Sequence, residues 1–295
     1  MADAKETVLG IIGGSGLYEI DGLNNTRWER VESPFGDPSD EFLFGDIAGK
    51  KVVFCPRHGR GHRIPPSDIN FRANIDALKR SGVTEILSVS AVGSLKEALA
   101  PGAFVVVDQF IDRTFAREKS FFGTGLVAHV GLGHPVCARL GDALEDGAKA
   151  LGIKTQRGGT YLAMEGPQFS SLAESELYRS WGCDVIGMTN MPEAKLAREA
   201  EICYATVAMV TDFDCWHPDH DHVTVDAIIQ VLLGNADNAR ALVKDTAPRL
   251  AGRTEACHAG CHTALDNALI TAPDARDPAM AEKLSAVAGR VLNGG

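Results

Sequence analysis

Two carboxylates follow an apolar run in the second half of the chain. Residues 205–210 predict a buried strand, and Asp212 and Asp214 come directly after it. Because side chains alternate along extended backbone, two acids at this spacing can point to the same side. Such a pair can accept hydrogen bonds from a ligand or give it a proton, so it is a candidate site for acid chemistry.

Other polar groups also follow predicted strands. Residues 13–16 read Gly-Gly-Ser-Gly, whose backbone N–H groups and Ser15 hydroxyl can surround an anion, although a plain tight turn is the simpler account. Tyr18 replaces the third glycine of a dinucleotide fingerprint, so a dinucleotide site is disfavoured. Arg57 and His58 can hold an oxyanion, and Phe169 can either stack on a flat ligand or pack in the core.

Strands alternate with helices along the chain. Strands are predicted near residues 8–12, 51–55, 85–89, 103–107, 160–164, 184–186 and 205–210. Helices are predicted near residues 69–81, 134–151, 171–181, 193–201 and 224–247. This order predicts an α/β sheet with helices on both faces, whose strand ends carry the polar groups and bind ligands. No linker divides the chain, so one domain is expected over residues 1–295, with a core at about 8–250 and a partly helical appendage at 253–295.

Composition excludes several classes of function. The chain has 295 residues and a formal net charge of −10, which argues against nucleic-acid binding through a basic surface. No segment approaches roughly 18 uninterrupted apolar residues, so no membrane span is expected. The first seven residues are polar rather than a secretory signal, which favours a cytoplasmic protein.

Two segments contain metal-binding residue types. His217, His220 and His222 are interleaved with acids, but their spacing fits no familiar ligand set and a mobile loop is the preferred account. Three residues separate Cys257 from Cys261, so they are no haem attachment motif, and no second pair is expected to complete a zinc site. A redox or disulfide role for this pair stays open, and no metal ligand is predicted.

Five ordered motifs together resemble the 5′-methylthioadenosine phosphorylase branch of the trimeric purine nucleoside phosphorylase family. They are residues 11–17, 57–59, 165–170, 188–193 and 211–216, and residues 110–114 also fit. The resemblance runs from about Val8 to Thr246 and does not cover the part after about Arg253. It implies the nucleoside phosphorylase fold, a single-domain mixed twisted sheet flanked by helices, and a homotrimer with active sites at subunit interfaces.

The resemblance also implies a role for each matching residue. The phosphate site would consist of Ser15, Arg57, His58, Ser90, the backbone of Ala91, and Thr189. The nucleoside would be bound by Met188 against the ribose and by Phe169, Asp212, Phe213 and Asp214 around the base. Specificity would depend on Ser170, Val225 and Ile228, the last two lining the pocket for the 5′ substituent, and His129 would reach a neighbouring subunit's site. Gly187 departs from the animal relatives, which carry asparagine there.

The implied reaction is phosphorolysis of S-methyl-5′-thioadenosine to adenine and 5-methylthioribose 1-phosphate. Phosphate is the nucleophile and co-substrate, so no cofactor is expected. Asp212 is expected to handle the proton at N7 of adenine and Asp214 to hold the 6-amino group, although which acid carries the proton is left open. Three alternatives also stay open: a phosphorylase for inosine, guanosine or methylthioinosine, a nucleoside hydrolase, and a nucleoside-binding protein without activity.

Overall fold

A large mixed sheet forms the centre of the molecule. The computed structural model describes residues 7–14, 16–218, 225–250 and 257–293. Within these residues eleven strands form one sheet in the order β2-β3-β4-β1-β5-β10-β9-β7, while β11 pairs with β5 and β6, and β8 with β6. The strands are β1 (Val8–Gly13), β2 (Leu23–Glu29), β3 (Phe42–Ile47), β4 (Lys50–Pro56), β5 (Val83–Ser94), β6 (Phe104–Val106), β7 (Gln109–Asp112), β8 (Thr155–Arg157), β9 (Thr160–Ala163), β10 (Val185–Gly187) and β11 (Cys203–Asp212). The predicted α/β class with a mixed sheet is confirmed.

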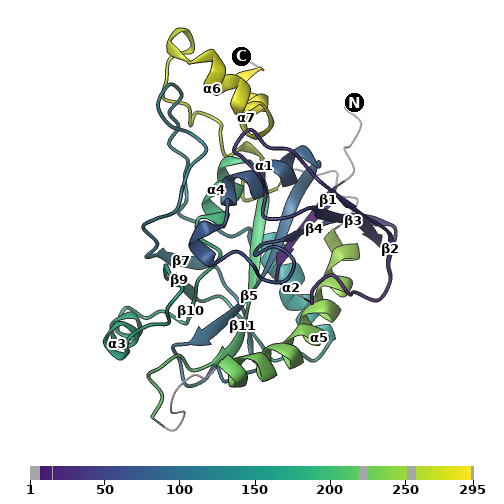
Figure 1. Ribbon diagram of the computed structural model, residues 1–295, viewed down its shortest axis with the longest axis vertical. Coiled ribbons are helices and arrows are strands. Elements are labelled where there is room, and N and C mark those ends of the chain that lie inside the picture. Colours follow the sequence, from purple (N-terminus) through teal and green to yellow (C-terminus); the bar gives the residue numbers. More distant parts are fainter. Residues whose placement is uncertain (1–6, 15, 219–224, 251–256, 294–295) are drawn as a thin grey trace.

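Helices cover both faces of this sheet (Figure 1). They are α1 (Phe71–Arg80), α2 (Ala138–Ala150), α3 (Leu172–Ser180), α4 (Glu193–Glu199), α5 (Val225–Leu250), α6 (Pro278–Lys283) and α7 (Ser285–Leu292). On one face α1 packs against α4 and α7, and on the other α2 packs against α5 and β11. Each face encloses its own apolar cluster, so the sheet is buried on both sides near its centre.

Strands β5 and β11 lie at the centre of the sheet and position most of the candidate site. They are parallel, from the pair Cys203 and Glu85 to the pair Asp212 and Gly93, with a shift in register just before Asp212. Nine of the ten residues of β11 are buried, as its unbroken apolar sequence predicts. The carboxyl ends of β5 and β11 lie beside each other, as do those of β1 and β4. The polar segments that follow these strands therefore meet at one edge of the sheet.

Four strands were not predicted from the sequence. β2 is almost entirely exposed and β8 has only three residues, so neither shows the apolar pattern of a buried strand. β3 and β7 also lie outside the predicted strands. Helix α2 begins at Ala138 rather than near residue 134, after the capping position Cys137.

The tail packs against the rest of the molecule. Two short helices, α6 and α7, follow a 3-10 turn at Pro273–Ala275, and Ala128 forms an isolated β-bridge with Leu269. Arg290 on α7 forms an ion pair with the buried Glu201. Within the described residues, no helix is both long and apolar enough to cross a membrane.

Candidate active site

Asp212 and Asp214 form the first half of the site, at the end of β11. The backbone N–H of Asp214 donates to Asp212 Oδ1 at 2.8 Å, and the Thr211 hydroxyl donates to Asp212 Oδ2 at 2.6 Å. Asp214 has a left-handed backbone, with φ of +53°. Its Oδ2 atom is buried and has no hydrogen-bond partner among the described residues. A buried acceptor of this kind is suited to a ligand N–H group.

Burial raises the pKa of both acids. For Asp212 the effect of burial outweighs the hydrogen bonds from Thr211 and the Asp214 N–H, which lower the pKa. For Asp214 burial raises the pKa and the charge of Asp212 raises it further, whereas the nearby Ser175 hydroxyl lowers it. A raised pKa keeps a proton available closer to neutral pH, which general acid chemistry requires.

Gly93 on β5 leaves the space that the two acids occupy. A Cβ atom on Gly93 would lie 2.9 Å from Asp212 Oδ1 and 3.3 Å from the Asp214 Cβ. The absence of a side chain at this position is therefore a condition for the acid pair.

Arg57 lies at the other end of the site, in a buried ion pair. Its guanidinium donates to both carboxylate oxygens of Glu193, at 2.8 and 3.1 Å, and also to Val89 O and Ser88 Oγ. These bonds use four of its five N–H groups. Burial acts to raise the pKa of Glu193, but Arg57 and hydrogen bonds from Ser88 and Tyr204 lower it below the usual value. The paired hydrogen bonds that an arginine can make to an oxyanion are here made to Glu193, and one N–H of Nη1 remains for a ligand.

His58 is neutral and acts through one nitrogen. Its Nδ1 lies 2.9 Å from Ile64 O, and because a carbonyl only accepts, Nδ1 carries the proton. Burial, followed by the charge of Arg57, lowers the pKa of His58 to about 4. Its Nε2 is therefore an acceptor at neutral pH. In this arrangement His58 can hold an oxyanion by accepting from a protonated oxygen rather than by donating.

Three hydroxyl groups gather near Arg57, which donates to Val89 O, the residue before Ser90. Ser90 Oγ lies 2.7 Å from Thr189 Oγ1 and 3.3 Å from the Tyr161 hydroxyl, which is 3.4 Å from Thr189 Oγ1. Ala91 follows Ser90 on β5 and its side chain is exposed. Ser15 lies outside the described residues. The structure thus brings Ser90 and Thr189 together as predicted and adds Tyr161 to them.

The position of the Tyr161 side chain accounts for the glycine at position 187. A Cβ atom at Gly187 would lie 2.1 Å from the Tyr161 hydroxyl, so any side chain there would displace the tyrosine. The tyrosine hydroxyl fills the space that an asparagine side chain would need. The departure at Gly187 is therefore compensated on the neighbouring strand β9.

The residues expected around the nucleoside lie along the same edge. Phe213 is 7 % exposed and its ring contacts Trp216 and His217, whereas Phe169 is 52 % exposed. Met188 and Trp216 pack against the same small apolar cluster, which includes Met164. Ser170 Oγ lies 3.5 Å from Met164 Sδ. Val225 and Ile228 begin α5, and their side chains lie outside the described part of the chain. His129 is exposed and its backbone N–H donates to Ala268 O at 2.9 Å.

Two site residues were not identified from the sequence. Glu193 contacts Arg57 across 136 positions of the chain, and Tyr161 lies inside a buried strand. Glu193 is the last residue of the motif at 188–193 and the first residue of α4. An acid at a helix start is common, so its presence there does not indicate a site residue.

The structure adds two cysteines to the pair considered in the sequence. The Sγ atoms of Cys257 and Cys261 meet those of Cys137 and Cys203, so a second pair does accompany them. The four positions are too far apart in the sequence for a spacing motif to show this. Most of the histidine-rich segment lies outside the described residues, apart from His217 and Pro218.

The fold and these residues define a class of protein. A family model described as the phosphorylase superfamily matches residues 8–247, and the chain belongs to this family. It is 69 % identical over 288 residues to the S-methyl-5′-thioadenosine phosphorylase of Rhodospirillum rubrum, covering 98 % of both chains. It is 62 % identical to the enzyme of that name from Cereibacter sphaeroides, covering 98 % of this chain and all of the other.

Solved structures give the same result. A methylthioadenosine phosphorylase from an antarctic soil metagenomic library aligns with a TM-score of 0.90 at 48 % identity, covering 95 % of this chain and 98 % of that one. The methylthioadenosine phosphorylase from Schistosoma mansoni in complex with adenine aligns with a TM-score of 0.77 at 36 % identity, covering 83 % and 92 %. The predicted family is confirmed.

Proposed function

We propose that this protein catalyses the reversible phosphorolysis of S-methyl-5′-thioadenosine to adenine and 5-methylthioribose 1-phosphate. The relatives that carry this activity in their names cover nearly the whole chain. The reaction belongs to purine and methionine salvage, and it uses inorganic phosphate as co-substrate with no further cofactor.

The spacing of two groups along β5 carries the proposal. Ser90, with Thr189 beside it, and Gly93, with the acid pair beside it, are three residues apart on one strand. Three residues of extended strand span about 10 Å. The hydroxyls and the buried carboxyls both lie near the carboxyl end of β5, where a nucleoside can meet phosphate at its C1′ face and the carboxyls at its base.

The proposed phosphate site orients the nucleophile. Ser90 and Thr189 donate to phosphate, Arg57 contributes its remaining N–H and its positive charge, and His58 Nε2 accepts from the protonated oxygen. Glu193 fixes the Arg57 guanidinium with a 2.8 Å bond, so the charge is already in place when phosphate arrives. Phosphate attacks the anomeric carbon while the bond to adenine breaks.

The acid pair recognises the base and assists its departure. Asp212 handles the proton at N7, so that adenine does not leave as an anion, and the unpartnered Asp214 Oδ2 accepts from the 6-amino group. A 6-oxo purine would place an acceptor against this acceptor, which costs about 1–3 kcal/mol.

Assembly and location are part of the proposal. Large apolar side chains are exposed around α3, among them Leu172, Leu177 and Trp181. Grouped apolar side chains of this kind favour contact with another protein surface, and we propose a homotrimer in which His129 reaches the next subunit's site. Seven free cysteines suit a reducing compartment such as the cytoplasm.

The direct test measures adenine. The purified protein is mixed with S-methyl-5′-thioadenosine, with and without phosphate, and free adenine is followed by chromatography. We expect adenine with phosphate only, together with an equal amount of 5-methylthioribose 1-phosphate. Release without phosphate would indicate a hydrolase, and no release under either condition would reject the proposal.

Substrate choice is tested by Asp214→Asn. The amide replaces one acceptor by a donor, so kcat/KM for methylthioadenosine should fall about tenfold to a hundredfold relative to methylthioinosine. Parallel assays with inosine and adenosine measure the preference of the wild-type protein. Unchanged preference for the 6-amino substrate in the variant would show that Asp214 does not read this group.

A further inference from the structure

Four cysteine side chains from distant parts of the sequence meet in the interior. The Sγ atoms of Cys137, Cys203, Cys257 and Cys261 all lie within 4.8 Å of one another. Each residue is at most 6 % exposed, and all four are free thiols. A single buried cysteine behaves as a small hydrophobic residue, but four thiols around one point offer a complete set of metal ligands.

Two of the sulfur–sulfur distances match those around one tetrahedral ion. Cys137 Sγ lies 3.5 Å from Cys257 Sγ, which lies 3.7 Å from Cys261 Sγ. Zinc–sulfur bonds of about 2.3 Å in a tetrahedron place the sulfur atoms about 3.8 Å apart. An iron–sulfur cluster would hold its cysteines farther apart, because its own iron and sulfide atoms lie between them.

Basic side chains surround the cluster. Arg198 Nη1 lies 3.9 Å from Cys261 Sγ, and His262 Nε2 lies 3.4 Å from Cys203 Sγ. Arg139 lies beside Cys137 and Cys203 and also forms an ion pair with the buried Glu85, while its buried Nε has no hydrogen-bond partner in the described structure. Zn²⁺ with four thiolates carries two negative charges, which these donors would offset in the interior.

The local backbone presents both tail cysteines to one point. Gly260 N–H donates to Cys257 O at 2.8 Å and closes a turn between the two cysteines. Gly260 has φ of +66°, a left-handed conformation that glycine adopts without strain. Cys137 caps α2 and Cys203 begins β11, so the other two sulfurs come from the ends of rigid elements.

We propose that Cys137, Cys203, Cys257 and Cys261 bind one Zn²⁺ ion that fastens the tail to the sheet. Four protein ligands leave no open position for a substrate, so the ion is structural. The cluster is at the start of β11, whereas Asp212 ends it, on the order of 30 Å away along ten residues of strand. The site is therefore separate from the proposed phosphorolysis site and does not depend on it.

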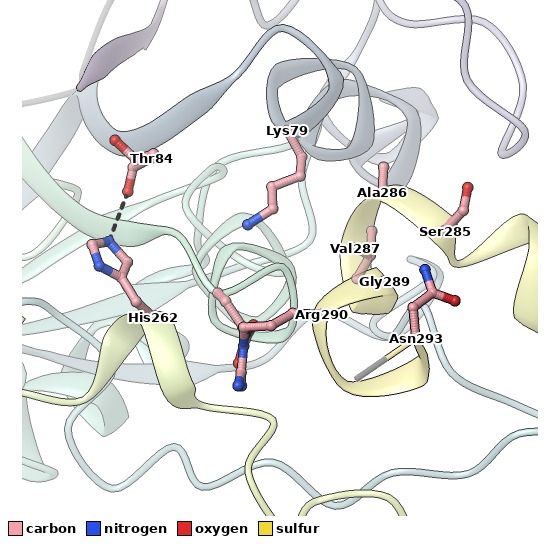
Figure 2. A pocket seen from close by; sticks show the side chains of 10 residues that line it. Lys79, Thr84, His262, Ser285, Ala286, Val287, Gly289, Arg290 and Asn293 are labelled. Atoms are coloured by element: carbon pink, nitrogen blue, oxygen red, sulfur yellow. Dashed lines mark hydrogen bonds and ion pairs between the residues drawn. The ribbon is translucent and has the colours of Figure 1, made fainter. Parts of the chain in front are cut away.

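A surface pocket lies beside the cluster. The pocket has a volume of about 390 Å³ and is lined by residues of α1, the tail and α7, including Lys79, His262 and Arg290. In Figure 2 His262 lies in its wall, hydrogen-bonded to Thr84 O. Since the same His262 nitrogen contacts Cys203 Sγ, this side chain connects the pocket wall to one of the four thiols.

The test measures metal directly. The full chain is produced with zinc, purified under reducing conditions and analysed by mass spectrometry for metal per chain. We expect about one Zn²⁺ per wild-type chain, and near-complete loss in the double variant Cys257→Ser/Cys261→Ser. Cys183→Ser is the matched control, since Cys183 is also buried but stands outside the cluster, and it should keep the ion.

Cobalt distinguishes this cluster from the histidine-rich segment. Co²⁺ added to the metal-free wild-type protein should give intense thiolate-to-cobalt charge-transfer bands and the visible bands of a tetrahedral site. Histidine or carboxylate ligands alone give no thiolate bands. This readout uses the wild-type chain, so it does not depend on whether the double variant folds.

Several outcomes would overturn the proposal. A wild-type chain without zinc that also takes up no Co²⁺ would do so, as would peptide mapping that finds disulfides among the four cysteines. Retention of zinc by a folded double variant would place the metal elsewhere. Phosphorolysis is assayed in parallel, and loss of activity without loss of metal would concern the proposed function only.

Discussion

His58 illustrates how burial sets the chemistry of a single residue. Its pKa is lowered to about 4 in the folded chain, against an ordinary value of 6.5. Between these values the unfolded chain binds more protons, so stability rises with pH across this window. The contribution is complete above about pH 6.5 and is lost as the pH falls to about 4, and it amounts to roughly 3 kcal/mol.

The variant His58→Gln should therefore reduce the acid sensitivity of the fold. Urea unfolding at pH 5 and pH 7 should show a smaller loss of free energy of unfolding in the variant than in the wild type. His134→Gln is a matched control, because His134 is exposed and is not among the buried polar residues. Equal losses in wild type and His58→Gln would show that His58 is not held neutral by the fold.

At the scale of secondary-structure elements, strands β9 and β10 together position the Tyr161 hydroxyl. The strands are parallel, with Val185 opposite Tyr161 and Gly187 opposite Ala163. Gly187→Ala would bring a methyl group within 2.1 Å of the Tyr161 hydroxyl, so the ring must move away from Ser90 and Thr189. Overpacking of this kind costs about 1–3 kcal/mol.

We expect Gly187→Ala to lower the melting temperature and to raise the KM for phosphate more than the KM for the nucleoside. Gly131→Ala is the control, since a Cβ atom there meets nothing within 4 Å. An unchanged phosphate KM in a stably folded Gly187→Ala protein would remove Tyr161 from the phosphate site.

Helix α5 supports the glycine-rich loop that follows β1. Arg240 Nη1 donates to Gly16 O at 2.6 Å, across the gap between α5 and the loop. Arg240→Ala should loosen the loop and weaken phosphate binding by about tenfold or more, because one hydrogen bond from a charged group contributes about 1.5–3 kcal/mol when partly buried. Arg249→Ala on the same helix removes an exposed i,i+4 pair with Asp245 and should leave the phosphate KM unchanged. Similar phosphate KM values for the two variants would contradict the support by Arg240.

The elements that could be predicted are those with a strong local pattern. β11 is an unbroken apolar run, and α3 begins at a capping box formed by Ser171 and Glu174, so both appear in the sequence. β2 is exposed and carries no such pattern. Contacts across the chain could not be predicted: Arg57 meets Glu193, and Cys137 meets Cys257, only because the sheet brings distant segments together.

At the scale of the whole molecule, the proposed homotrimer predicts that neighbouring subunits complete each other's sites. Asp212 and Asp214 belong to one chain, whereas His129 lies on an exposed segment beside the tail and is proposed to serve the neighbour. A closed ring of three subunits has one such contact at each interface. Both Asp214→Asn and His129→Ala homotrimers should then be impaired at every site, and mass measurement in solution should give three chains.

Mixing the two variants should restore activity if this arrangement is right. A subunit carrying His129→Ala keeps its own acids, and a neighbour carrying Asp214→Asn supplies an intact His129, so a complete site forms between them. In trimers assembled from equal amounts, one half times one half, or about a quarter of the sites, are complete. A mixture of Asp214→Asn with Asp212→Asn is the control, since both changes damage the same half of the site and no mixture repairs it. If co-assembled Asp214→Asn and His129→Ala chains show no more activity than the sum of the two parents, then His129 does not complete the neighbouring site.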